Sequence, residues 1–143
     1  MSTVPRSSAA APARCRVTIV IKSFNEGANI CAAIESSLAA VAEVGGEVVL
    51  ADSYSTDRTV ELALKYPIRV VQLAHAHERC CGAGPQLGYQ HSLGDYVYIL
   101  DGDMRMLRGF LGPALAFLAR HPEAAGVGGR LVEVQDLTGI GKQ

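Results

Sequence analysis

The most chemically suggestive stretch of this sequence is Asp101-Gly102-Asp103, which directly follows the apolar run at residues 96–100. In an extended chain the two carboxylates lie about 6–7 Å apart, and they repel each other unless a cation or donor cluster compensates. Hard divalent ions such as Mg²⁺ take oxygen ligands, commonly one or two carboxylates plus substrate phosphates. Gly102 would let the backbone approach a bulky ligand closely. The triplet therefore predicts a metal site that joins the protein to a diphosphate.

A tight turn is the alternative explanation, because Asp-Gly is a common sequence in type I and type I′ turns. The tripeptide alone favours the turn. Its position favours the ligand site, since a hairpin needs a second strand directly afterwards. The sequence Met104-Arg105-Met106-Leu107 leads instead towards a helix.

Short apolar runs alternate with helical patterns along the chain. The expected strands are residues 17–21, 47–51, 68–73, 96–100 and, weakened by glycine, 124–134. The expected helices are residues 30–44, a short helix capped by Thr56 or Asp57 and ending near Lys65, a helix starting near Pro85, and residues 109–120. This alternation predicts an α/β domain with a mostly parallel sheet and helices on both faces.

Polar loops follow three of the expected strands, with the sequences KSFNEG, DSYSTD and DGDM. Ligands of such domains bind at strand carboxyl ends where the strand order reverses, so neighbouring first and fourth strands would bring these loops into one crevice. Lys22 and Ser23 stand closest to the first strand end, where phosphate or base contact is expected. Asp52 can accept hydrogen bonds from a base or a ribose. It can equally build loop turns together with Ser53 and Ser55.

Composition and charge narrow the possible functions. The net charge is −1, with 13 Lys and Arg against 14 Asp and Glu, and no basic stripe supports a nucleic-acid partner. No apolar run approaches the roughly 20 residues that span a bilayer, so no transmembrane segment is expected. The four cysteines form no C-x-x-C pair, which favours a reducing, cytoplasmic setting, with the membrane periphery as an alternative. Cys80 and Cys81 are interpreted as small helix-packing residues rather than nucleophiles.

The chain is expected to form one ordered domain with short flanking segments. Residues 1–16 contain arginine, serine, alanine and proline but no acid, and are interpreted as a disordered leader. Residues 17–135 are expected to form the α/β domain, and residues 136–143 an irregular tail.

Three loop regions together resemble the family 2 glycosyltransferases, which have the GT-A fold. The matching stretches are VTIVIKSFNEGANI, EVVLADSYSTDRT and GDYVYILDGDM, in this order. The first contains the aromatic-Asn-Glu of Phe24-Asn25-Glu26, and the last contains an acid-x-acid (DXD) motif. The glycine-rich segment from Arg79 to Tyr96, before the fourth strand, is also similar. The set is specific, although each piece alone is weak.

This resemblance implies a site for a nucleotide-diphospho-sugar, linked to UDP or GDP, and a divalent cofactor, Mn²⁺ or Mg²⁺. It implies that Asp52 contacts the base, that Asp101 contacts the ribose or belongs to the metal shell, and that Asp103 binds the metal itself. The other donor-binding residues expected from the matching motifs and strand ends are Lys22, Ser23, Phe24, Glu26, Arg79 and Gly102.

The sequence departs from the family pattern at two positions and in length. Lys22 stands where the family usually has proline, and Tyr54 where it commonly has glycine. The resemblance implies that the acceptor site and, in inverting enzymes, the general base belong to a second half that follows the matching region in family members. Nothing around Glu133 or Asp136 marks either as that base, so the catalytic residue and the acceptor stay unknown. The chain resembles the donor half.

Three functions are compatible with parts of this pattern. The first is a sugar transferase, or a piece of one. The second is a non-catalytic nucleotide-sugar-binding module or partner subunit, alone, as a homo-oligomer or with a partner chain. The third, a dinucleotide-dependent oxidoreductase, needs G-x-G-x-x-G straight after the first strand, and KSFNEG lacks it.

Overall fold

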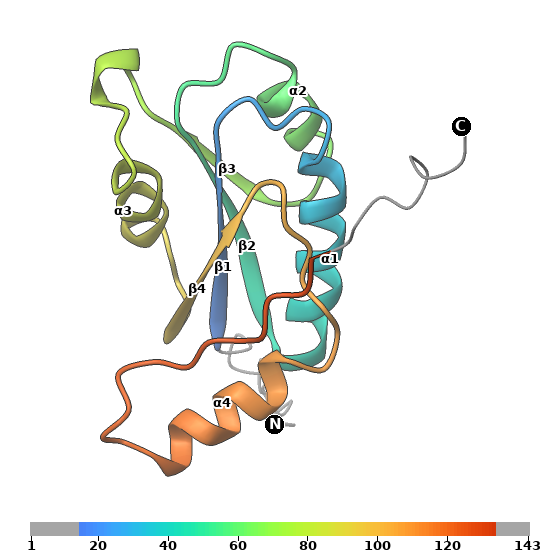
Figure 1. The fold of residues 1–143 in the computed structure, drawn as a ribbon, viewed down its shortest axis with the longest axis vertical. Coiled ribbons are helices and arrows are strands. Elements are labelled where there is room, and N and C mark those ends of the chain that lie inside the picture. The colour runs from blue at the N-terminus through green and yellow to red at the C-terminus, as the bar shows by residue number, and fades with distance from the viewer. Residues whose placement is uncertain (1–14, 134–143) are drawn as a thin grey trace, which may run out of the picture.

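Four parallel strands form the sheet at the centre of the molecule (Figure 1). The computed structural model describes residues 15–133. Its strands are β1 (Val17–Ser23), β2 (Gly46–Asp52), β3 (Arg69–Gln72) and β4 (Tyr96–Asp101). Their order across the sheet is β3-β2-β1-β4, and each neighbouring pair is parallel. The predicted α/β architecture with a parallel sheet is therefore confirmed.

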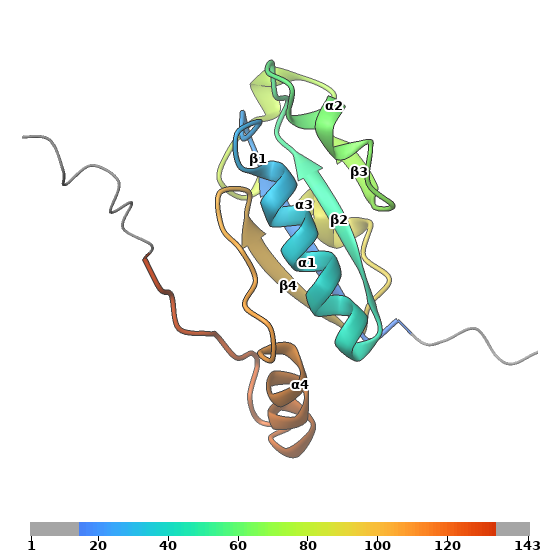
Figure 2. The ribbon, with the colours of Figure 1, turned by 90° about the vertical axis from the view of Figure 1, so that its right-hand side faces the viewer.

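Helices cover both faces of this sheet (Figure 2). They are α1 (Ile30–Val44), α2 (Thr59–Ala63), α3 (Ala83–Gln90) and α4 (Leu111–Arg120), with a short 3-10 helix, η1, at Ala76–Glu78. One face carries α1, which contacts α2 and α4, and the opposite face carries α3, which contacts β1 and β2. The predicted helices are all present, with ends shifted by a few residues.

The middle residues of β1 and β2 are mostly apolar and buried because helices cover both faces of these strands. Ile19 and Ile21 of β1 and Leu50 of β2 pack with Ile30 and Ile34 of α1, and all five side chains are fully buried. Each such side chain contributes about 1.5–3 kcal/mol relative to an exposed position. This apolar layer fixes which face of β1 turns towards α1.

The register of the sheet brings the carboxyl ends of its strands to one edge. Ser23 at the end of β1 pairs with Asp52 at the end of β2, while Lys22 pairs with Asp101 at the end of β4. The chain passes from β1 through α1 to β2 on one side, and β4 lies on the other side of β1. The strand order thus reverses between β1 and β4, so the three predicted loops meet there.

Gly88 allows α3 to lie directly against β1. A Cβ atom at this position would stand 2.1 Å from Cγ1 of Val20, which is fully buried. Gly84 lies one turn earlier, where a Cβ would stand 3.3 Å from the Cβ of Lys22. The glycines weaken α3 as an isolated helix, and close packing on the sheet is the reason for their presence.

The strand predicted over residues 124–134 is wrong for residues 124–133, which have no regular secondary structure. Residue 134 lies outside the described range. Glycine occupies three of the positions 126–129, and its backbone loses the most conformational freedom on ordering while offering no side chain to bury. Leu131 and Val132, which a buried strand would have covered, are 66% and 57% exposed.

The expected leader and tail fall largely outside the described residues. Residues 1–14 and 136–143 are not among them. Cys15 and Arg16, at the end of the expected leader, are described and bonded to the sheet. The Tyr96 N–H donates to the Arg16 carbonyl at 3.1 Å, and the Arg16 N–H donates to the Gly45 carbonyl at 3.0 Å.

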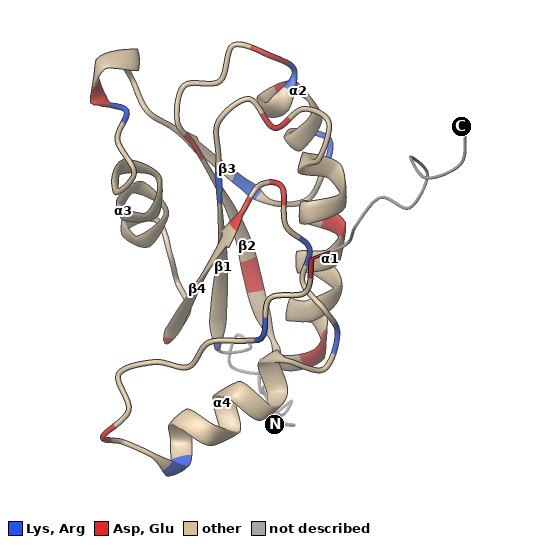
Figure 3. Ribbon diagram, viewed as in Figure 1, with Lys and Arg blue, Asp and Glu red and all other residues tan. Residues whose placement is uncertain are grey.

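Charged residues of both signs are dispersed over the ribbon (Figure 3). Lys and Arg do not gather on one element of the described residues. In residues 15–133, no helix has both the length and the apolar character needed to cross a membrane.

The close contact at Gly88 leads to a stability prediction. Gly88→Ala is expected to lower the free energy of unfolding by about 1–3 kcal/mol, because the added methyl collides with Val20. Gly112→Ala in α4 is the matched control, since a Cβ there meets nothing within 4 Å. The control should be as stable as the parent or more so. Urea denaturation measures both variants, and equal stability of the two would contradict the packing argument.

Candidate functional site

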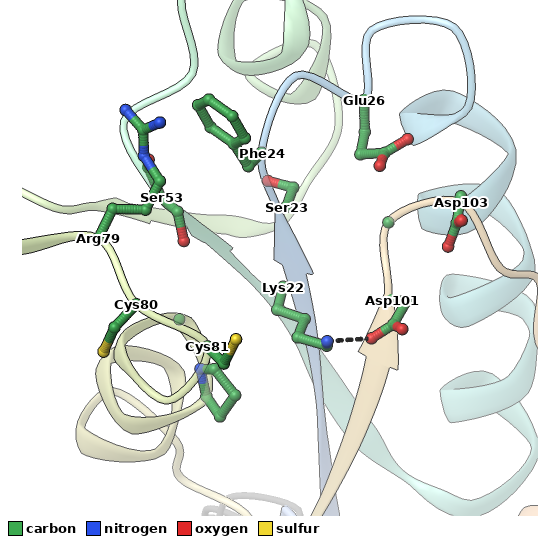
Figure 4. Close-up of a pocket in the computed structure, with 13 residues that line it drawn as sticks. Lys22, Ser23, Phe24, Glu26, Ser53, Arg79, Cys80, Cys81, Asp101 and Asp103 are labelled. Atoms are coloured by element: carbon green, nitrogen blue, oxygen red, sulfur yellow. Dashed lines mark hydrogen bonds and ion pairs between the residues drawn. The ribbon is translucent and has the colours of Figure 1, made fainter. Parts of the chain in front are cut away.

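A pocket of about 330 Å³ lies at the carboxyl ends of β1 and β4 (Figure 4). Its walls come from the end of β1 and the loop that follows, the residue after β2, the segment leading into α3, and the turn after β4. The lining residues are Lys22, Ser23, Phe24, Glu26, Ser53, Arg79, Cys80, Cys81, Gly84, Pro85, Asp101, Gly102 and Asp103. The structure therefore brings together every residue predicted to bind a donor or a metal, except Asp52.

The acidic triplet forms a turn and also lines the pocket, so the two explanations from the sequence are compatible. The Met104 N–H donates to the Asp101 carbonyl at 3.0 Å, which closes the turn, and the Gly102 N–H donates to the Lys22 carbonyl at 3.0 Å. A Cβ on Gly102 would stand 2.9 Å from Cγ of Glu26. No strand follows within residues 102–110, and the hairpin alternative is therefore wrong.

Lys22 points from β1 towards β4 and forms an ion pair with Asp101 (Figure 4). The distance between Lys22 Nζ and Asp101 Oδ1 is 2.7 Å, and the two side chains are 39% and 40% exposed. The hydrogen bond to Asp101 raises the pKa of Lys22 above its ordinary value of 10.5, so the side chain is charged at neutral pH. One of the two carboxylates thus already has a cationic partner within the chain.

The carboxylates of this turn suit a cation that is shared with a ligand. Asp101 and Asp103 supply the oxygen donors that Mg²⁺ and Mn²⁺ prefer. Across residues 15–133, no group of three or more His, Cys, Asp or Glu side chains is arranged to hold an ion by itself. Mg²⁺ is usually held by one or two carboxylates, with water and substrate phosphates completing its shell. The residues therefore fit a metal that also binds a diphosphate.

Asp52 lies beneath the pocket and is fully buried. Its Oδ1 accepts hydrogen bonds from the hydroxyls of Ser23, at 3.1 Å, and Ser55. Its Oδ2 accepts from the Ser55 N–H and from Gln72 Nε2, each at 2.8 Å. A buried carboxylate needs such donors, and they occupy both oxygens. The loop-building alternative matches this arrangement, and the contact between Asp52 and a base stays a prediction.

The loops after β1 and β2 are joined by hydrogen bonds between side chains and backbone. The Asn25 N–H donates to Ser55 Oγ at 2.9 Å, and Asn25 Oδ1 accepts from the Thr56 N–H at 2.9 Å. The Glu26 N–H donates to Thr59 Oγ1 at 2.8 Å. These bonds hold the start of the first loop, and with it the pocket residues on either side of Asn25, in a fixed position.

Asp57 connects the same two loops and caps α2, as expected from the sequence. Its Oδ1 accepts from the Thr59 N–H at 2.9 Å, although the residue directly before the helix is Arg58. Its Oδ2 accepts from the Gly27 N–H at 2.9 Å. The hydrogen bonds from Thr59 lower the pKa of Asp57 below its ordinary value of 3.8. The carboxylate is thus engaged in loop structure, away from the pocket lining.

Tyr54 explains why the family commonly has glycine at its position. Its backbone φ is 66°, in the left-handed region that side chains disfavour and glycine adopts freely. The loop after β2 keeps this turn because Ser53 and Ser55, on either side, are held by Arg79 and Asp52. A tyrosine at this position therefore places strain in the loop.

The outer rim of the pocket consists of Phe24 and Arg79 (Figure 4). The guanidinium carbon of Arg79 lies 3.8 Å from the centre of the Phe24 ring. Arg79 Nε donates to the Ser53 carbonyl at 3.1 Å, which fixes the stacked pair against the loop after β2. The phenyl ring is 39% exposed, so a flat surface remains accessible beside the pocket.

Five lining residues were missed by the sequence reasoning. They are Ser53, Cys80, Cys81, Gly84 and Pro85. The interpretation of Cys80 and Cys81 as helix-packing residues is wrong, because both are exposed and precede α3. The available signal was the glycine and proline at positions 82–85, which marks the start of the helix and leaves Cys80 and Cys81 just before it.

The sequence of this chain matches a model of a known protein family. The family model described as Glycosyl transferase family 2 matches residues 18–143. The chain therefore belongs to glycosyl transferase family 2, in agreement with the resemblance of its loops. A comparison with curated proteins gives no match.

Solved structures of two proteins are similar to this chain. S. aureus TarS 1-349 has a TM-score of 0.65 at 24% sequence identity, covering 75% of this chain and 33% of that one. The same TarS segment in complex with UDP-GlcNAc gives a TM-score of 0.66, at 24% identity, with coverages of 75% and 32%. The fold is thus that of the GT-A glycosyltransferases.

The second protein is glucosyl-3-phosphoglycerate synthase from Mycobacterium tuberculosis, in complex with Mn²⁺, UDP and glucosyl-3-phosphoglycerate. Its TM-score is 0.58 at 26% identity, covering 73% of this chain and 39% of the synthase. The chain therefore spans between 32% and 39% of the length of these chains.

The strained φ at Tyr54 leads to a prediction that compares two substitutions. Tyr54→Gly and Tyr54→Ala both remove the aromatic ring, but only glycine relieves the left-handed conformation. Tyr54→Gly is expected to be more stable than Tyr54→Ala by about 1 kcal/mol. Chemical denaturation of the two variants side by side measures this difference. A Tyr54→Ala variant at least as stable as Tyr54→Gly would show that the loop adopts another conformation.

Proposed function

We propose that this chain binds a nucleotide-diphospho-sugar through a divalent cation at Asp101 and Asp103, as the donor-binding part of a glycosyltransferase. The observation that carries the proposal is the convergence of these carboxylates with Lys22, Phe24 and Arg79 on one pocket. Membership of glycosyl transferase family 2 supports it. UDP-GlcNAc in TarS, and Mn²⁺ with UDP in the mycobacterial synthase, support it further.

The charges of the pocket suit a diphosphate held jointly by protein and metal. Asp101 and Asp103 would bind the cation from the protein side, and the diphosphate would complete its shell. When bound, Mn²⁺ or Mg²⁺ would neutralise the leaving diphosphate as the anomeric carbon is attacked. Ser53 lines the pocket, and its hydroxyl group can donate to phosphate or sugar oxygens, whereas the Ser23 hydroxyl already donates to Asp52.

The base is assigned to the rim made by Phe24 and Arg79. Aromatic rings and guanidinium planes both stack on nucleobases, and such stacking tolerates different bases. The hydrogen bond from Arg79 to the Ser53 carbonyl keeps this surface in place before a ligand arrives. Asp52 acts indirectly in this assignment, because it fixes Ser23 and the loop that carries Ser53 from below.

A module that binds the donor without transferring it is the second candidate. The observation that favours this candidate concerns the acids of the pocket. Among residues 15–133, Glu26 is the only acid of the lining besides the assigned metal ligands. Its Oε2 accepts from Asn29 Nδ2 at 3.2 Å, at the start of α1. Turnover separates the candidates: a transferase releases UDP or GDP from the donor when acceptors are supplied, and a binding module does not.

The assignment of Asp103 is tested by metal-dependent nucleotide binding. Asp103→Asn is expected to remove the dependence of UDP or GDP binding on Mn²⁺, with a loss of about tenfold or more in affinity when the metal is present. Isothermal titration calorimetry with and without Mn²⁺ measures this.

Glu123→Gln, at an exposed residue just after α4, is the matched control for lost negative charge. It should leave binding unchanged. Metal-dependent binding that survives intact in Asp103→Asn would reject the assignment of the metal to this carboxylate.

The assignment of the base is tested at Phe24. Phe24→Ala is expected to weaken UDP binding by roughly five- to a hundredfold, because stacking contributes about 1–3 kcal/mol per base. Phe24→Tyr keeps the ring and should retain affinity. Calorimetry with UDP, and with pyrophosphate as a ligand that has no base, distinguishes the effects. An equal loss for both ligands would place the base elsewhere.

A further inference from the structure

The ion pair between Lys22 and Asp101 places a fixed cation beside the carboxylates assigned to the metal. The Lys22 ammonium lies 2.7 Å from Asp101 Oδ1. The other cation of the pocket lining, Arg79, is stacked on Phe24 and bonded to the Ser53 carbonyl. The two positive groups therefore have separate partners, and Lys22 is the one that faces the acidic turn (Figure 4).

We infer that Lys22 is a specificity-determining residue that holds Asp101 until the donor arrives and then binds the donor diphosphate. In the free chain, Lys22 takes the carboxylate that a divalent cation would need. In the loaded site, Lys22 releases Asp101 and contacts the phosphates. This inference rests on the proposed function, because it assumes that a diphosphate and a metal share the pocket.

In the absence of a ligand, the positive charge of Lys22 beside Asp101 opposes the binding of a divalent ion to the same carboxylate. A divalent ion on Asp101 would lie within a few ångströms of the Lys22 ammonium, and like charges at about 4 Å repel each other even at the effective dielectric of a protein surface. A diphosphate removes the conflict, because its negative charge can satisfy the metal and the lysine together. Lys22 therefore opposes the binding of a divalent ion alone, but it does not oppose the binding of the ion together with a nucleotide.

The geometry allows Lys22 to change partners without moving the strand. Its backbone carbonyl accepts from the Gly102 N–H, and its Cβ lies close to Gly84, so the base of the side chain is held on both sides. The side chain is 39% exposed at its outer end. Lysine has a flexible four-carbon stem and three donors that suit phosphate oxygens. The proline that the family usually has at this position carries no charge, so it can neither pair with Asp101 nor bind the diphosphate.

A variant that lacks the positive charge of Lys22 is expected to change the affinities for Mn²⁺ and for UDP in opposite directions. Lys22→Met keeps the aliphatic stem and is expected to bind Mn²⁺ in the absence of nucleotide about tenfold more tightly than the parent chain, since Asp101 becomes available. The same variant should bind UDP in EDTA about tenfold more weakly, since the phosphates lose a donor. The favourable coupling between Mn²⁺ and UDP should decrease accordingly.

The experiment measures free Mn²⁺ by electron paramagnetic resonance and UDP binding by calorimetry, in EDTA and in Mn²⁺. Lys22→Met and Lys22→Gln should agree with each other, and Lys22→Arg should resemble the parent because it keeps the charge. Lys65→Met is the matched control for net charge. Lys65 lies just after α2, and its Nζ is 3.7 Å from Oε1 of Glu61. This substitution should change neither affinity.

The outcomes separate this inference from the proposed function. If the parent chain binds UDP with Mn²⁺ but Lys22→Met and Lys22→Gln leave the Mn²⁺ affinity unchanged, the role of Lys22 is rejected and the donor site stands. A loss of both affinities also rejects the role, because a change of opposite sign is required. If the parent chain binds no UDP in Mn²⁺, the proposed function fails and the inference fails with it.

Discussion

The parallel pairing of β1 with both β2 and β4 is the constraint on which the site depends. Because backbone hydrogen bonds fix β1 on each side, the positions of Ser23, Asp52 and Asp101 are set by register rather than by loop conformation. The reversal of strand order leaves an opening between β1 and β4 at their carboxyl ends. The polar residues meet there because the apolar side chains of β1 and β2 are buried between α1 and α3.

Buried contacts explain why so much of the fold could be predicted from the sequence. The strands and α1 are short apolar runs or helical patterns whose burial leaves few alternatives, and the structure places them within a few residues of expectation. The segment at residues 124–133 was predicted wrongly because its apolar residues alternate with glycine. The sequence pattern of a segment does not reveal whether other elements of the fold lie beside it to bury Leu131 and Val132, and both are exposed here.

The residues that line the site could be predicted to a similar extent, whereas the hydrogen bonds around Asp52 could not. Residues at strand ends, such as Lys22 and Asp101, could be placed from topology alone. Asp52 also stands at a strand end, but the direction of its side chain depends on partners from three other positions, Ser23, Ser55 and Gln72. Hydrogen-bond partners separated by about 20 to 30 positions along the chain leave no local signal in a single sequence.

The two exposed cysteines before α3 have a consequence for how such a pocket diversifies. Cys80 and Cys81 form part of the wall, and both are exposed rather than packed in the core. Exposed positions of this kind tolerate exchange at little cost in stability, whereas Asp52 and its hydrogen-bond partners do not. Evolution can therefore reshape this wall for a different ligand while the frame beneath it stays unaltered.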